Sequence, residues 1–166
     1  MELQIIPKQQ EIPGFDPNAQ AVKHIEYYPL GDVYEEAEIT QEVISRMLSE
    51  IPKGIGAYFF LDPDGESDWM EVVSDGKWLF LGCCFEDEET GDFDCRYCYN
   101  PEFADTADLI ENADFSDESI YTPIESGGRS PIPKIQALTD MELGVKAVEY
   151  FIRTGKCYPG IDWIKD

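Results

Sequence analysis

The clearest pattern of hydrophobic and polar positions lies between residues 57 and 85, where three apolar runs are separated by turn residues. Residues 57–61 and 69–74 flank an Asp-Pro-Asp-Gly turn, and residues 77–85 follow an Asp-Gly pair. Short aromatic and β-branched runs between such turns are typical of strands. The spacing therefore predicts a three-stranded antiparallel meander with Trp69, Glu71 and Val73 on one face.

Two other segments have helical periodicity. Residues 41–50 follow Thr40, whose hydroxyl can cap a helix, and their apolar side chains fall on one face. Residues 140–154 carry an apolar stripe that includes Val148, and Gly155 supplies the left-handed residue that commonly ends a helix. We therefore predict helices at both places.

These segments predict a single α+β domain over residues 1–166. Its core would be an antiparallel sheet of about five or six strands, packed by two main helices at residues 41–50 and 140–154. Residues 1–30 carry four prolines and little periodicity, so we expect an irregular arm with a short strand near its end. Residues 86–118 are expected to form an acidic excursion from the sheet.

Charge narrows the possible partners. The chain has 35 acidic residues and 12 basic ones, which gives a formal net charge of −23. Such a protein repels nucleic acid and anionic lipid and attracts basic protein surfaces. High negative charge can also serve only to keep a protein soluble. The uneven placement of the acids favours a binding role.

The acidic excursion is the predicted binding segment. It carries thirteen acids and a single base, Arg96, with aromatic residues interleaved. Carboxylates can occupy the Lys and Arg side chains of a cleft that holds nucleic acid, and aromatic rings supply an apolar anchor. The simpler alternative is a solvated loop. The predicted partner-binding residues are Glu86, Asp87, Glu88, Glu89, Asp92, Asp94, Tyr97 and Tyr99.

The chain contains five cysteines, which are Cys83, Cys84, Cys95, Cys98 and Cys157. An odd number without a signal peptide favours free thiols in a reducing compartment. Cys95 and Cys98 form one half of a zinc motif, but the adjacent Cys83 and Cys84 would point to opposite faces of a strand. We therefore expect buried thiols, no metal site and no cofactor. Zinc bound at Cys95 and Cys98 is the alternative.

The chain offers little sign of catalysis or of a membrane partner. It contains one histidine, His24, and neither a G-x-S-x-G elbow nor a Gly-rich phosphate loop. Its start, Met1-Glu2-Leu3-Gln4, lacks the features of a signal peptide, and no apolar run approaches the ~20 residues of a membrane span. We therefore predict a cytoplasmic protein that is not an enzyme.

Residues 40–163 resemble the immunity proteins of bacterial polymorphic toxin systems. The likeness rests on a helix-then-hairpin unit that ends in Phe59-Phe60-Leu61-Asp62-Pro63-Asp64-Gly65, on the loop Glu125-Ser126-Gly127-Gly128, and above all on the ending. There, residues 147–155 close a helix with Thr-Gly, and Pro159 and Ile161-Asp162-Trp163 follow. The pattern is most similar to the first-numbered immunity family, which includes inhibitors of deaminase toxins.

The resemblance implies a cytoplasmic antitoxin. Such a protein would bind a cognate toxin domain with a basic surface, of the deaminase or nuclease type, and would cover its active site without binding nucleic acid itself. One alternative is an acidic regulatory domain, or a nucleic-acid mimic, that binds another basic protein. Another is a small metal-dependent enzyme.

Overall fold

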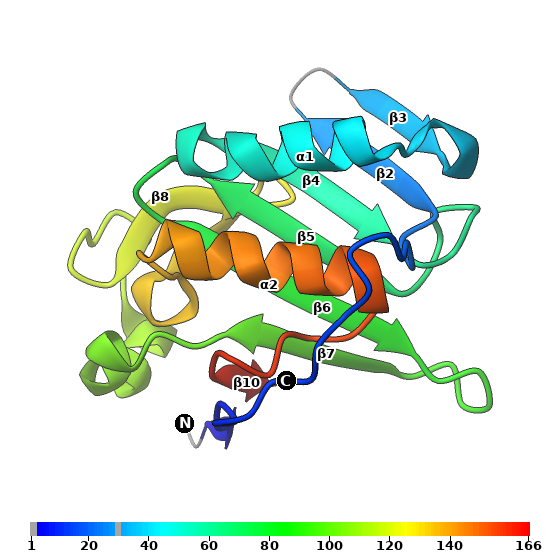
Figure 1. The fold of residues 1–166 in the computed structure, drawn as a ribbon. Helices are drawn as coiled ribbons and strands as arrows, with labels where there is room; N and C mark the ends of the chain where they lie inside the picture. Colours follow the sequence, from blue (N-terminus) through cyan, green and yellow to red (C-terminus); the bar gives the residue numbers. More distant parts are fainter. Residues whose placement is uncertain (1–2, 29–30) are drawn as a thin grey trace.

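The fold is built on one large antiparallel sheet. A computed structural model describes residues 3–28 and 31–166, so Met1, Glu2, Pro29 and Leu30 of the predicted arm lie outside the described residues. The sheet has eight strands in the order β1-β10-β7-β6-β5-β4-β2-β3, and a separate hairpin pairs β8 with β9 (Figure 1). The strands are β1 (Gln4–Ile6), β2 (His24–Tyr28), β3 (Asp32–Glu35), β4 (Ile55–Phe60), β5 (Trp69–Ser74), β6 (Leu79–Glu86), β7 (Phe93–Cys98), β8 (Tyr121–Ser126), β9 (Ser130–Pro133) and β10 (Trp163–Lys165).

The predicted meander forms the centre of this sheet. Strands β4, β5 and β6 pair in sequence order, with Phe59 opposite Met70 and Met70 opposite Cys83. Met70 and Cys83 are fully buried, while Trp69 lies on the opposite face. Glu71 and Val73 share that face with Trp69 because side chains alternate along a strand. The prediction that these three residues lie on one face is therefore confirmed.

The sheet is larger than expected, and the prediction of five or six strands with two main helices is wrong. Short strands form both edges of the sheet. At one edge β1 pairs with β10, and at the other β3 pairs with β2, which in turn pairs with β4. Strands of three to five residues beside prolines carry too short a pattern to stand out in the sequence. The α+β class is nevertheless correct.

The helices pack on one face of the sheet (Figure 1). Helix α1 (Gln41–Glu50) begins after Thr40, whose hydroxyl accepts a hydrogen bond from the Val43 amide. Helix α2 (Met141–Thr154) has Asp140 as its N-cap and ends at Gly155, which is left-handed. Their buried side chains meet the sheet in one core that includes Val148. Short 3-10 segments are η1 (Glu36–Glu38), η2 (Ile51–Lys53), η3 (Pro101–Asn112) and η4 (Lys134–Gln136).

Segment η3 is the longest of the 3-10 segments, and the sequence did not reveal it. The side chain of Asn100 accepts a hydrogen bond from the Glu102 amide and donates one to the Ala137 carbonyl. Phe103 packs against Trp78, with 5.8 Å between ring centroids. This half of the predicted acidic excursion is therefore fastened to the domain.

The N-terminal arm is also fastened. Between β1 and β2 its backbone is irregular, as expected, but the amide of Ala21 donates to the Ile152 carbonyl and the guanidinium of Arg153 donates to the Ala19 carbonyl. Phe15 packs edge-on against Tyr150. Within residues 3–28 and 31–166, every helix is too short or too polar to cross a lipid bilayer.

Candidate functional site: the open face of the sheet

The sheet face opposite α1 and α2 is covered over only part of its area. Hairpin β8–β9 covers one part by packing on a second apolar cluster, which contains Trp78, Phe80, Ile124, Ile132 and Ala137. The uncovered part, which we call the open face, carries aromatic and acidic side chains. Its residues include Glu26, Tyr28, Tyr58, Phe60, Trp69, Glu71 and Phe93. Tyr28 and Phe93 are among the most exposed large apolar side chains of the described residues.

Aromatic rings form a continuous row across the open face. The ring centroid of Phe60 lies 5.5 Å from that of His24 and 6.1 Å from that of Trp69, and Trp69 lies 5.7 Å from Phe93. Tyr58 stacks beside Phe60 at 6.1 Å. Rings at these separations attract one another and restrict each other's motion. His24 and Phe60 are buried within this row, so the part that a partner can reach is formed by the exposed ring of Phe93 and the half-buried ring of Trp69. Rings of this kind anchor protein interfaces.

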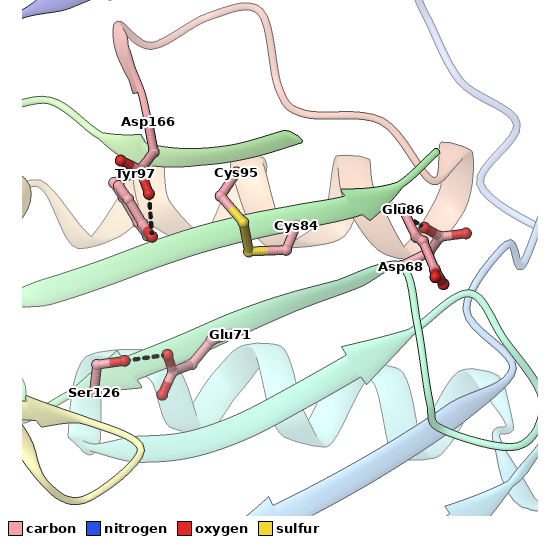
Figure 2. Close-up of a disulfide and its surroundings, with 8 residues drawn as sticks. All are labelled: Asp68, Glu71, Cys84, Glu86, Cys95, Tyr97, Ser126 and Asp166. Carbon is pink, nitrogen blue, oxygen red and sulfur yellow. Dashed lines mark hydrogen bonds between the residues drawn. A yellow bond between two sulfur atoms is a disulfide. The ribbon is translucent and has the colours of Figure 1, made fainter. Parts of the chain in front are cut away.

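Glu71 fastens the β8–β9 turn to the open face. Its carboxylate accepts hydrogen bonds from the Ser126 hydroxyl at 2.5 Å, from the Gly127 amide at 2.7 Å and from the Tyr58 hydroxyl at 3.0 Å. Figure 2 shows the bond between Glu71 and Ser126, which joins β5 to the end of β8. Because the side chain is buried, these bonds replace the water that an exposed carboxylate would bind.

A pocket of about 600 Å³ opens beside this carboxylate. Its lining includes Tyr28, Tyr58, Glu71, Glu125 and Gly127. Burial raises the pKa of the Tyr58 phenol, and the negative charge of Glu71 raises that pKa further. Tyr58 therefore remains a neutral donor, and the pocket carries carboxylates without a basic side chain in its lining.

The acidic turn, residues 86–92, joins β6 to β7 at one end of the open face. The Asp87 amide donates to the Asp92 carbonyl at 2.8 Å, and the Asp87 carboxylate accepts from the amides of Glu89 and Thr90. The amide of Glu86 donates to the Asp68 carboxylate (Figure 2), which ties the turn to the loop after β4. The turn is therefore an ordered structure that holds its other carboxylates in solvent.

The structure brings some of the predicted partner-binding residues together and separates others. The acidic turn holds Glu86, Asp87, Glu88, Glu89 and Asp92, and all five are exposed.

The other three predicted residues lie apart from this group. Asp94 points toward the helix face, where it pairs with Arg96 at 3.4 Å. Tyr97 lies at the far end of β7 and donates a hydrogen bond to Asp166 (Figure 2). Tyr99 comes just after the end of this strand. The aromatic side chain beside the acidic turn is Phe93, which pairs with Glu86 across β6 and β7.

The expectation that all cysteines are free thiols is wrong. Cys84 and Cys95 face each other across β6 and β7 and form a disulfide (Figure 2). Cys83, Cys98 and Cys157 are free, and Cys83 lies on the opposite face from Cys84, as expected.

The disulfide also bears on the zinc alternative. Cys95 and Cys98 stand three positions apart on one strand, so their side chains point to opposite faces and do not converge on one ion. Among the described residues, no group of His, Cys, Asp or Glu side chains is arranged to hold a metal.

Sequence reasoning missed the pocket around Glu71. One signal was available: Glu71 is the only charged residue in the apolar strand β5. A carboxylate at such a position needs hydrogen-bond donors. The donors come from Ser126 and Gly127, more than fifty positions away, and no local pattern joins the two segments.

Comparison of the chain with protein-family models, with curated proteins and with solved structures finds no match. The resemblance to immunity proteins therefore rests on the sequence motifs alone and stays a prediction.

Proposed function

We propose that this protein is an immunity protein, an antitoxin that binds a basic, nucleic-acid-active toxin domain and blocks its active site. The observation that carries the proposal is the acidic turn: an ordered loop that holds exposed carboxylates directly beside the exposed ring of Phe93. An active site that grips a phosphate backbone carries Lys and Arg for that purpose. Carboxylates can occupy those groups and offer nothing to cleave or deaminate.

The two parts of this surface would act on different steps of binding. Long-range attraction between the carboxylates and a basic cleft speeds association and weakens as salt is added. Burial of Phe93 and its neighbour Trp69 would slow dissociation, because aromatic anchors contribute most of the short-range binding energy. In this proposal the protein inhibits by occupying a surface and performs no catalysis.

The proposed compartment is the cytoplasm, where such a toxin meets its nucleic-acid substrate. Disulfides are uncommon there, so the Cys84–Cys95 bond weighs against this part of the proposal. Counting thiols in protein that is trapped by alkylation at the moment of lysis tests the compartment. Five alkylated cysteines would support a cytoplasmic, reduced form, and three would contradict it.

The inhibitory function is tested by neutralisation. Toxin domains of the deaminase or nuclease type from neighbouring genes would be expressed from an inducible promoter, with and without the full chain. We expect growth to be restored and the toxin's activity on nucleic acid to be inhibited in vitro at one inhibitor per toxin. Tight binding that leaves the toxin fully active would refute inhibition and would favour an acidic regulatory domain.

The role of the acidic turn is tested by binding kinetics. Replacing Glu88, Glu89 and Asp92 by Lys should lower the association rate at low salt by about tenfold or more, and the difference should shrink as salt rises. These side chains are exposed, so the fold should persist. The dissociation rate should change less, because steering acts before contact.

A matched control places the same charge change elsewhere. Asp32, Glu36 and Glu42 are exposed residues of β3, η1 and α1, at the opposite edge of the sheet. Their triple Lys variant has the same net charge as the variant of the acidic turn. Equal association rates for the two variants would show that only net charge matters and that the acidic turn is not the docking surface.

A further inference from the structure

The pocket beside Glu71 contains a buried carboxylate that has no counter-ion among the residues that the structure describes. Glu71 is only 7% exposed, and its three hydrogen-bond donors are a phenol, a hydroxyl and a backbone amide, all neutral. Among the described residues, none of the ion pairs includes it. Buried charges in folded proteins are normally paired with an opposite charge. Within residues 3–28 and 31–166, Glu71 has hydrogen-bond donors but no cationic partner.

The surroundings of this carboxylate make the pocket more negative. Glu125 lines the pocket and is exposed at its rim, and Glu26 lies close enough to raise the pKa of Tyr58 by its charge. Burial raises the pKa of Tyr97, and the charges of Asp166 and Glu71 raise it further. The negative charge of Glu71 thus raises the pKa of both tyrosines. A pocket with this field attracts a cation and repels an anion.

Aromatic rings form part of the pocket lining. The rings of Tyr28 and Tyr58 meet edge to face at 6.1 Å, and both line the pocket together with the Cβ-free backbone of Gly127 and Gly128. Tyr28 is 45% exposed, so a ligand can reach its ring from solvent. The combination of carboxylates and tyrosine faces is suited to a cation that is flat and weakly hydrated.

We propose that this pocket receives the guanidinium group of an arginine side chain from the basic partner. The inference rests on the proposed function for the identity of the partner, whereas the cation preference follows from the pocket itself. A guanidinium can stack on a tyrosine ring while its N–H groups meet a carboxylate. The acceptors are the carboxylate of Glu125 and the one lone-pair site of Glu71 that its three donors leave unused, on the Oε1 atom that accepts from Ser126. An ammonium group is more strongly hydrated and stacks less well.

The volume of the pocket agrees with this occupant. About 600 Å³ accommodates an arginine side chain together with bridging waters. The pocket lies on the same open face as the row of aromatic rings, with Tyr58 belonging to both. A partner seated on the acidic turn and the rings could therefore insert an arginine here as a second, specific contact.

The cation preference is tested on the full chain without any partner. The probe is N-acetyl-L-arginine amide, and the matched control is N-acetyl-L-citrulline amide, which has nearly the same shape but no charge. We expect the arginine probe to bind with a Kd on the order of millimolar and to shift the amide resonances of Gly56, Gly127 and Gly128. The citrulline probe should leave them in place. Equal shifts from both probes, or shifts only at the acidic turn, would overturn the proposal.

Variants locate the site. Glu125→Gln and Tyr28→Leu should each weaken binding of the arginine probe about fivefold, whereas Glu88→Gln, which removes the same charge from the acidic turn, should leave it unchanged. Glu71→Gln keeps an acceptor for the Gly127 amide and should weaken binding at least as much as Glu125→Gln. The exposed variants decide the question even if Glu71→Gln loosens the β8–β9 turn. Wild-type affinity in both Glu125→Gln and Tyr28→Leu would exclude this pocket.

The identity of the occupant is tested with the toxin domain. If the partner inserts an arginine, Glu125→Gln should raise the dissociation rate of the complex about tenfold, and the association rate should change little. A complex that forms but dissociates at the wild-type rate would overturn the assignment to the partner. A wild-type chain that fails to bind the toxin would refute the proposed function, and the probe titration would still decide the cation preference.

Discussion

Helix α2 packs so closely on the sheet at Gly144 that a Gly→Ala substitution there should destabilise the protein, although the same change usually stabilises a helix. Gly144 lies in the middle of α2 and is buried. A Cβ at this position would overlap the Cδ2 methyl of Leu79 and lie 3.4 Å from its Cγ. Leu79 is fully buried and cannot turn away into solvent. The glycine is therefore required by packing, although helix propensity disfavours it.

The expected size of the effect follows from two opposing contributions. In an exposed helix, Gly→Ala stabilises by about 1 kcal/mol. Forcing an extra methyl group into a packed core costs about 1–3 kcal/mol. We expect the second contribution to dominate, so that Gly144→Ala destabilises the protein by about 1 kcal/mol and lowers the melting midpoint by about 2–4 °C.

The assay is a double-mutant cycle in urea or thermal unfolding. Leu79→Ala alone should destabilise by about 2–5 kcal/mol because it leaves a cavity. In that background the methyl of Ala at 144 enters the space that Leu79 vacated, so Gly144→Ala should stabilise. The sign of one substitution thus reverses between two backgrounds. Stabilisation by Gly144→Ala in the wild-type protein would show that α2 does not lie this close to β6.

Three further predictions concern the core, the disulfide and alkaline pH. Val148 is fully buried, so Val148→Asp should lower the free energy of unfolding by several kcal/mol; an unchanged melting midpoint would contradict the packing of α2. Protein purified in air should show three reactive thiols after denaturation and five after reduction, because Cys84 and Cys95 are bonded. Burial and the hydrogen bond to Glu50 raise the pKa of Tyr27 from 10.0 to about 12. The unfolded chain loses this proton near pH 10 and the folded chain holds it, so stability is full below pH 10 and falls as pH rises toward 12. Tyr27→Phe should flatten that decline in denaturant titrations between pH 9 and pH 12.

The centre of the sheet could be predicted from the sequence because its strands pair with their neighbours along the chain, so that the pattern of each strand and turn is enough to place it. Strands β4, β5 and β6 follow one another with short turns, and the alternation of side chains along β5 is enough to place Trp69 and Glu71 on one face. The sheet edges depend on contacts between distant segments. Gln4 pairs with Lys165, almost the full length of the chain apart, and three-residue strands carry no recognisable periodicity of their own.

The candidate site follows the same division. The carboxylates of the acidic turn were evident as a run in the sequence, and their exposure agrees with that pattern. Nearness in sequence favours Tyr97 and Tyr99 as the aromatic residues that lie beside the acidic run. In the structure the row of rings beside the acidic turn instead joins Phe93 to Trp69 across β6. The Glu71 pocket needs the β8–β9 turn, whose position depends on tertiary packing.

The two faces of β5 have different roles: one packs in the main core, and the other faces the surface that we propose for binding. Met70 and Val72 point into the main core and are fully buried, while Trp69 and Glu71 point to the open face. Substitutions one position apart should therefore have different consequences. A polar residue at Val72 should unfold the protein, whereas Glu71→Gln should remove the charge of the pocket, keep an acceptor for the Gly127 amide and leave the protein folded. An unfolding titration together with the arginine-probe titration distinguishes these effects on one strand. Loss of both properties at both positions would show that the open face is as much a part of the core as the face beneath the helices.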